Sequence, residues 1–213
     1  MVQKEHLLNK FIILLFCQLI FSCSETANKK SDNIFEKVDI SQVPNTSIFL
    51  NDNKLKLENG VYYFNNKPYS GFIKEIYNND TVKSFASYYQ GRQHGTTKTF
   101  FENGKLETER NYKNGIAYGR HYGYWKNGTM KFDFSYFNDK REGLQKQWYE
   151  SGSPYCFLMY KDDKEDGMQK AWRENGKPYI NYESKDGHRY GLQKANLCYT
   201  LRDGQIKTKS NEN

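Results

Sequence analysis

The residues best suited to metal or redox chemistry in this 213-residue chain are its histidines and cysteines, and their spacing argues against a site. His6 lies ahead of an apolar leader, and the other three, His94, His121 and His188, fall at unrelated positions. None has a metal-ligand spacing to another histidine or to a cysteine. The nearest combination is a soft-metal pair of His188 with Cys198. We favour the interpretation that these three histidines lie in surface loops, and we expect no metal and no cofactor.

Motifs for nucleophiles, nucleotides and calcium are also missing. The sequence contains no G-x-S-x-G, no H-E-x-x-H and no G-x-x-x-x-G-K-[ST]. Glycine pairs such as Gly91 with Gly95 are similar to a nucleotide loop, but they recur regularly and begin strands, so turns explain them. The acidic run at 161–166 lacks the ligand spacing of a calcium loop. We therefore expect no catalytic residue, no enzymatic activity and no small-molecule substrate.

A basic row is the remaining candidate for binding chemistry, because the chain has a net charge of +7. Five lysines share one position of a sequence repeat: Lys74, Lys98, Lys146, Lys170 and Lys194. Tyr122 interrupts this row. Such a row beside aromatic rings binds acidic lipid, glycan or nucleic acid in some proteins, and in others it only keeps an open sheet face soluble. We favour the solubilising role, and predicted export argues against nucleic acid.

The first 22 residues are predicted to be an export signal. Lys4 and Lys10 form a short basic region, and residues 11–21 (FIILLFCQLIF) are almost wholly apolar. That run is too short to cross a bilayer but is typical of a signal peptide. A small residue before Cys23 makes the end of the run resemble the lipobox of bacterial lipoproteins. The resemblance implies cleavage before Cys23 and lipid attached to it.

Two alternatives to the lipoprotein interpretation are an ordinary signal peptide and an uncleaved anchor. In the lipoprotein sorting rule of enteric bacteria, an aspartate after the cysteine favours the inner membrane, whereas this chain has Ser24. The resemblance therefore implies an outer-membrane lipoprotein of the bacterial cell envelope, on either side of that membrane. Residues 23–33 are polar and unpatterned, which is typical of a flexible tether.

The remainder of the chain repeats with a period of 24 residues. One glycine ladder consists of Gly71, Gly95, Gly119, Gly143, Gly167 and Gly191. A second consists of Gly104, Gly128, Gly152 and Gly176, and a third of Gly91, Gly115 and Gly187, with Asp139 and Asp163 between. A tyrosine ladder consists of Tyr88, Tyr112, Tyr136 and Tyr160. A regular period of this length is the signature of a repeat architecture.

Each repeat is predicted to form one β-hairpin. Residues 144–149 (LQKQWY) and 154–160 (PYCFLMY) have the composition and length of strands, and ESGS between them is a tight turn. The equivalent turns contain Asn-Gly, as in ENGK at 102–105, for which we predict type I′ geometry with positive φ at both central residues. Successive hairpins give an all-β fold, an elongated antiparallel meander that grows by about 10 Å per repeat.

Alternation along the strands separates two faces. The mostly apolar set of the return strands includes the tyrosine ladder, Ala86, Arg110, Cys156 and Tyr182. A second, partial aromatic stripe follows the outgoing strands: Tyr77, Phe101, Trp125 and Tyr149. A lone monomer has no need to expose such a stripe, so we predict that these four residues bind a partner.

The two cysteines of the repeat region are predicted to be reduced. Cys156 and Cys198 lie two repeats apart, so their Cα atoms are about 20 Å apart, too far for a disulfide. Because Cys156 belongs to the apolar set, we expect its thiol to be buried.

The repeat resembles the bacterial MORN-repeat variant family. The clearest copies are GTTKTFFENGKLETERNYKNGIAYG (95–119) and GMQKAWRENGKPYINYESKDGHRYG (167–191). Many such proteins are labelled YwqK-type antitoxins on the basis of the repeat. The predicted organisation is an N-terminal cap (34–60), a repeat array (61–207) and a disordered tail (208–213).

Three functional hypotheses follow. The first is a non-enzymatic, lipid-anchored scaffold that binds an unknown envelope protein through its exposed sheet face. The second is a membrane-lipid-binding or antitoxin/immunity-type protein, because the resemblance extends to repeats credited with membrane binding. The third is an enzyme, which would need catalytic residues that break the repeat, and the sequence shows none.

Overall fold

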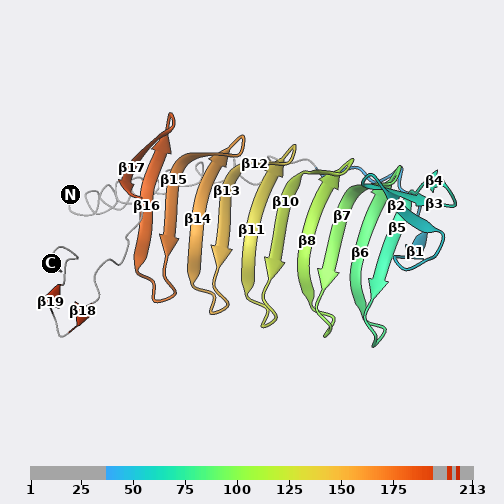
Figure 1. The fold of residues 1–213 in the computed structure, drawn as a ribbon, viewed down its shortest axis with the longest axis horizontal. Helices are drawn as coiled ribbons and strands as arrows, with labels where there is room; N and C mark the ends of the chain where they lie inside the picture. The colour runs from blue at the N-terminus through green and yellow to red at the C-terminus, as the bar shows by residue number, and fades with distance from the viewer. Residues whose placement is uncertain (1–36, 194–200, 203–204, 207–213) are drawn as a thin grey trace, which may run out of the picture. The chain divides into compact units, whose positions relative to one another are not determined.

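The computed structural model describes residues 37–193, 201–202 and 205–206 (Figure 1). The predicted signal peptide, Cys23, the tether, Lys194, Cys198 and the tail 208–213 lie outside the described residues. Within the described ranges, no helix has the length and apolar character needed to cross a membrane.

One 14-stranded sheet contains most of the repeat region, and its strands follow one another in chain order. The path is β1 (Ser47–Phe49), β5 (Gly71–Ile76), β6 (Val82–Tyr89), β7 (Arg92–Phe100), β8 (Leu106–Lys113), β10 (Gly119–Tyr124), β11 (Met130–Phe137), β13 (Gly143–Trp148), β14 (Pro154–Lys161), β15 (Lys164–Trp172), β16 (Pro178–Lys185) and β17 (His188–Leu192). All neighbours are antiparallel except β1, which pairs with β5 in parallel. The predicted all-β meander of hairpins is confirmed (Figure 1).

Shorter strands complete the fold. β9 (Ile116–Ala117) pairs with β8, and β12 (Lys140–Arg141) pairs with β11. β2 (Leu55–Glu58), β3 (Val61–Phe64) and β4 (Lys67–Pro68) form a separate three-stranded sheet, and β18 (Leu201–Arg202) pairs with β19 (Gln205–Ile206). The predicted cap thus contributes β1 and β2, while β3 and β4 join β2 rather than the main sheet.

The turn geometry differs from the prediction at the Asn-Gly turns. Between β7 and β8 only the glycine has a positive φ, 77° at Gly104. The Gly104 amide donates to the Phe101 carbonyl at 2.8 Å, and the Phe101 amide donates to the Lys105 carbonyl at 2.9 Å. This is a type I turn followed by a left-handed residue, a three-residue hairpin loop, so the predicted type I′ geometry is wrong here.

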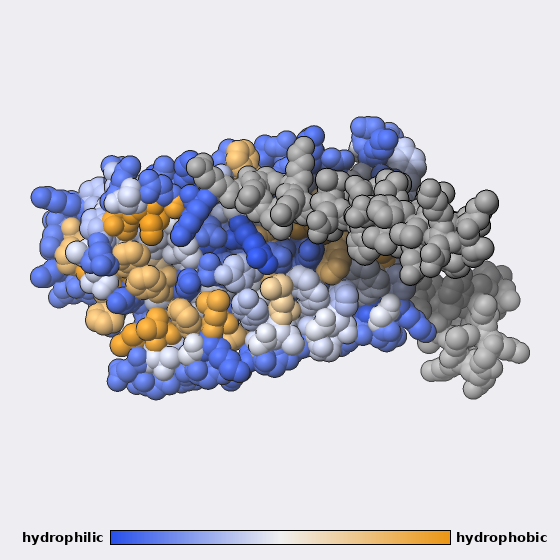
Figure 2. All heavy atoms as spheres, turned by 180° about the vertical axis from the view of Figure 1, so that it is seen from behind, coloured by the Kyte–Doolittle hydropathy of each residue, from blue (hydrophilic) through white to orange (hydrophobic). Residues whose placement is uncertain are grey.

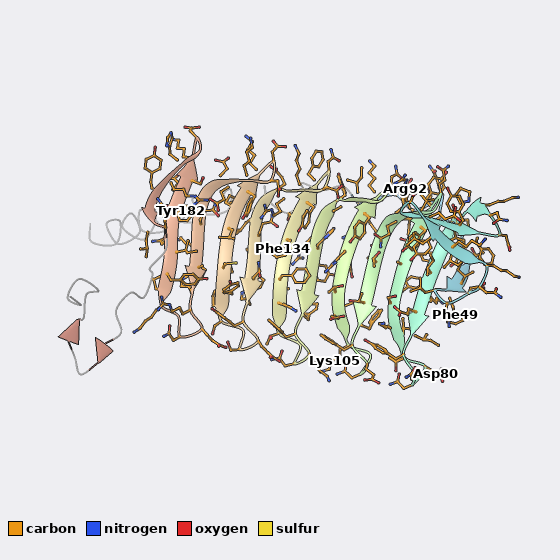
Figure 3. All side chains as sticks on the ribbon, viewed as in Figure 1. Phe49, Asp80, Arg92, Lys105, Phe134 and Tyr182 are labelled. Carbon is orange, nitrogen blue, oxygen red and sulfur yellow. The ribbon has the colours of Figure 1, made fainter. Side chains whose placement is uncertain are left out.

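Two-residue turns with positive φ at both central residues join the strands at their other ends, on the side of the sheet away from the three-residue loops. They are Gln90-Gly91, Asn114-Gly115, Asn138-Asp139, Asp162-Asp163 and Asp186-Gly187. The second position of each turn therefore belongs to the third ladder, with glycine at 91, 115 and 187 and aspartate at 139 and 163. In Figure 3, Asp80 and Lys105 mark the edge with the three-residue loops, called the tip edge below, and Arg92 marks the other edge.

The best-buried core lies where the small sheet packs on the first hairpin. Tyr69, Ile73, Ala86 and Tyr88 form a buried cluster, against which Ile48, Leu55, Tyr62 and Phe64 pack. Hydrophobic residues also gather on the opposite side of this end of the sheet (Figure 2). The remaining repeats form a single layer, in which most side chains are half-buried or exposed and few are buried.

Candidate interaction face

The two faces of the main sheet differ in character. We call the side that carries Tyr88, Tyr112, Tyr136 and Tyr160 the ladder face, and the side that carries Lys74, Lys98, Lys146 and Lys170 the lysine face. Ala86, Tyr88, Cys156, Tyr160 and Tyr182 of the predicted apolar set are buried. Arg110 of the same set is exposed.

An open hollow of about 360 Å³ lies on the ladder face over β8, β10 and β11. His121 lies in it between two rings, with centroids 5.4 Å from Tyr112 and 4.7 Å from Tyr136. Phe132 and Phe134 stack at 4.9 Å along one wall. The hollow is therefore mainly aromatic.

The surface-loop prediction is wrong for His121, whose residue is only 5% exposed. It lies within β10, and strand alternation points its ring onto the ladder face. Its Nε2 lies 2.7 Å from the Asn111 carbonyl oxygen, which fits an Nε2–H donor. Burial lowers the pKa of this imidazole below its ordinary value.

The other two histidines also lie in strands rather than loops. The ring nitrogens of His94 in β7 lie 2.8 Å from Asn114 Oδ1 and 2.8 Å from the Asp39 carbonyl oxygen. His188 in β17 is exposed. His188 directly follows the Asp186-Gly187 turn, and His94 lies three residues after the Gln90-Gly91 turn.

A second open hollow, also about 360 Å³, adjoins the first and shares Arg110 and Phe132 with it. Two residues of the predicted stripe, Phe101 and Trp125, line it. A Cβ at Gly123 would come within 2.5 Å of the Phe132 ring, so this glycine lets the ring lie across β10. The stripe and the apolar set therefore belong to one face at this part of the sheet.

The stripe residues are half-buried, and three of them bond to the next repeat. The Tyr77 hydroxyl donates to the Phe100 carbonyl at 2.9 Å. Trp125 Nε1 donates to the Trp148 carbonyl at 3.1 Å, and the Tyr149 hydroxyl donates to the Trp172 carbonyl at 3.0 Å. Phe101 has no polar atom for this bond. The stripe thus holds neighbouring tips together, and its partner-binding role stays a prediction.

Three of the four stripe rings also meet the residue six positions later, across their own hairpin. Lys131 Nζ lies 4.4 Å from the Trp125 ring centroid, and Lys83 Nζ lies 5.9 Å from the Tyr77 centroid. In the next repeat a ring replaces the cation, since Tyr155 meets the Tyr149 ring at 5.2 Å. Cations therefore lie over two of the four stripe rings.

The predicted lysine row lies on the opposite face and is partly paired. Lys98 Nζ lies 3.2 Å from Glu109 Oε2. Lys74 Nζ lies 5.6 Å from the Phe85 ring centroid. The solubilising role of the row stays a prediction.

Cys156 is a free thiol that is 6% exposed, as predicted. Burial raises the pKa of this thiol to about 11, so it remains protonated at neutral pH. Within residues 37–193, no group of three or more His, Cys, Asp and Glu side chains is placed to hold a metal ion. The predicted His188–Cys198 pair includes Cys198, which lies outside the described residues.

The family model of the MORN repeat variant matches residues 93–114 and residues 141–162. The first match spans β7, the three-residue loop and β8, and the second spans β13, its loop and β14. Their starts are 141 − 93 = 48 residues apart, or two periods. No curated protein matches the chain. Two hairpins of the array are therefore similar to the MORN repeat variant.

Proposed function

We propose that this chain is a non-enzymatic, lipid-anchored envelope protein whose ladder face is a scaffold for a protein partner. The observation that carries the proposal is the pair of adjoining hollows, bordered by Phe101 and Trp125 and joined by Arg110 and Phe132. Aromatic residues and arginine are enriched at protein interfaces and dominate their binding energy. The MORN repeat match supports a scaffold, since each added hairpin lengthens the face. Anchoring at Cys23 rests on the lipobox resemblance.

The partner can be captured with a photo-crosslinking residue at position 125 of the full chain, expressed in its native cells. We expect an adduct with one envelope protein, which is then purified and tested for direct binding. Trp125→Ala and Tyr149→Ala should each weaken this binding at least about tenfold. Lys164→Ala, beside a two-residue turn, is the matched control and should bind like the wild type. Undiminished binding by both alanine variants would refute the role of the stripe.

Membrane-lipid binding is the second candidate, and the cations over the stripe rings favour it. A Cys23→Ser chain, which has no lipid attachment site, should then float with vesicles that contain anionic lipid. Flotation that disappears in Lys131→Glu, without any protein adduct, would favour lipid over a protein partner. A toxin as the crosslinked protein would indicate an antitoxin or immunity-type role.

A further inference from the structure

A row of directly paired side chains crosses the lysine face, and its composition is nearly symmetric about Tyr122. The row consists of Lys74, Phe85, Lys98, Glu109, Tyr122, Asp133, Lys146, Phe157 and Lys170. Each end is Lys-Phe-Lys, and the centre is acid-Tyr-acid. Directly paired residues point to the same face of a sheet, so these side chains form one continuous line.

The acidic centre of this row is already neutralised within the sheet. Lys98 pairs with Glu109 at 3.2 Å. Arg120 forms two hydrogen bonds with Asp133, at 2.6 and 3.1 Å, and its guanidinium lies 5.1 Å from the Tyr122 ring centroid. Neither carboxylate is therefore available to the cations at the far end of the row.

Those cations, Lys146 and Lys170, have no ion pair with a carboxylate of the described residues. Lys146 is opposite Asp133, which Arg120 engages, and Phe157. Lys170 is opposite Phe157 and the neutral Asn181. Two positive charges therefore flank one aromatic ring without an ion pair, although Glu183 lies on the same face, opposite Met168.

The surface between the two lysines is apolar. The Phe157 ring meets Trp148 at 5.6 Å and Trp172 at 5.2 Å, both edge to face. On the other side of the row, Leu144 and Met168 are 37% and 42% exposed. We call these five residues, with Lys146 and Lys170, the Phe157 patch.

We propose that the Phe157 patch binds an acidic amphipathic segment of a partner polypeptide. Lys146 and Lys170 lie two strands apart, about 10 Å. Residues i and i+7 of a helix are separated by nearly the same distance, about 10.5 Å. A helix across β13–β15 would place carboxylates at i and i+7 on the two lysines and apolar side chains at i+3 and i+4 on Phe157. This site lies on the face opposite the stripe and goes beyond the function proposed above.

The test uses a displayed library of linear peptides of about 16 residues, roughly four helical turns, selected on the full chain. We expect the recovered peptides to carry acidic residues seven positions apart with apolar residues between them. The Lys146→Glu/Lys170→Glu double variant should bind them at least about tenfold more weakly. A peptide with lysines at the two acidic positions should prefer that variant to the wild type.

Two control variants and one further test variant make the outcome decisive. Lys74→Glu, at the other end of the row, and Trp125→Ala, on the ladder face, should bind the peptides like the wild type. Phe157→Leu should weaken binding while the circular dichroism spectrum is retained. The proposal is overturned if the peptides lack acidic residues, if the double variant binds them undiminished, or if Trp125→Ala abolishes binding. Retention of anionic vesicles by a Cys23→Ser chain, lost in the Lys146→Glu/Lys170→Glu double variant and seen without any recovered peptide, would assign the patch to a membrane surface and overturn the proposal too.

Discussion

The hydrogen bonds from the stripe to the next repeat can be tested by removing them and by adding one. Tyr77→Phe and Tyr149→Phe each delete a hydroxyl that donates to a backbone carbonyl, at 2.9 and 3.0 Å. Phe101 occupies the same repeat position without a hydroxyl, so the sheet already accepts phenylalanine there. Phe101→Tyr should create the missing bond, to the Tyr124 carbonyl by analogy with its neighbours.

The expected magnitude follows from the partial burial of these bonds. A neutral intramolecular hydrogen bond contributes a net stabilisation of about 0.5–1.5 kcal/mol. Because water reaches the tip edge, we expect the lower part of that range, about 0.5–1 kcal/mol for each bond. Tyr77 and Tyr149 are three repeats apart, so their effects should add. The double variant should lose about 1–2 kcal/mol, and Phe101→Tyr should gain about 0.5–1 kcal/mol.

Urea unfolding followed by tyrosine and tryptophan fluorescence measures these differences. A slope of about 1–3 kcal/mol per molar urea converts 1 kcal/mol into a midpoint shift of about 0.3–1 M. Tyr190→Phe is the matched control, because that residue is 60% exposed and its free energy of unfolding should not change. The reasoning is refuted if Tyr77→Phe and Tyr149→Phe leave the free energy of unfolding unchanged and Phe101→Tyr does not raise it. The stripe hydrogen bonds then do not stabilise the array.

Three further predictions concern the backbone, a histidine and a cysteine. Gly71→Ala should destabilise the fold more than Gly143→Ala in thermal unfolding. Both glycines have a positive φ, 140° and 75°, but a Cβ at Gly71 would also come within 2.8 Å of the Thr46 carbonyl oxygen, whereas the space around Gly143 is open. Burial lowers the pKa of His121 below its ordinary value of 6.5, so the stabilising contribution of this side chain is complete above pH 6.5 and is lost as the pH falls from there through the lowered pKa. His121→Gln, with the residue found one repeat later, should flatten the stability–pH curve in this window, and an unchanged curve would contradict it. Because burial raises the pKa of Cys156 to about 11, iodoacetamide should label it slowly at pH 8 in the native chain and rapidly in urea, as read by peptide mass spectrometry.

The array could be predicted from the sequence because its signals are local and recur. Gly104 and its equivalents mark one edge of the sheet, and Gly91 and its equivalents mark the other. The turn types do not follow from the sequence in the same way, because Asn-Gly occurs in the connections at both ends of the strands. Asn103-Gly104 lies in a three-residue loop, whereas Asn114-Gly115 is a two-residue turn. Strand length and register decide between the two geometries, and the dipeptide alone does not.

The candidate surfaces depend on the register between neighbouring strands, which cannot be deduced from the sequence of a single repeat. Phe157 lies between Lys146 and Lys170 only because β14 separates β13 from β15 with this pairing. The burial of His121 likewise follows from the rings of Tyr112 and Tyr136 on adjacent strands. The one sequence signal for the stripe bonds is the polar atom that Tyr77, Trp125 and Tyr149 share and Phe101 lacks.

The parallel pairing of β1 with β5 has a consequence for assembly. A flat sheet whose first and last strands both have unpaired outer sides can add further molecules, strand to strand, without limit, as in a fibre. The three residues of β1 occupy the outer edge of β5 and offer only a short run of their own for further pairing. If no molecule can pair at this outer strand, each molecule can be joined only through the last strand of its sheet, and growth stops. Edge-to-edge association of this protein would therefore end at a closed pair.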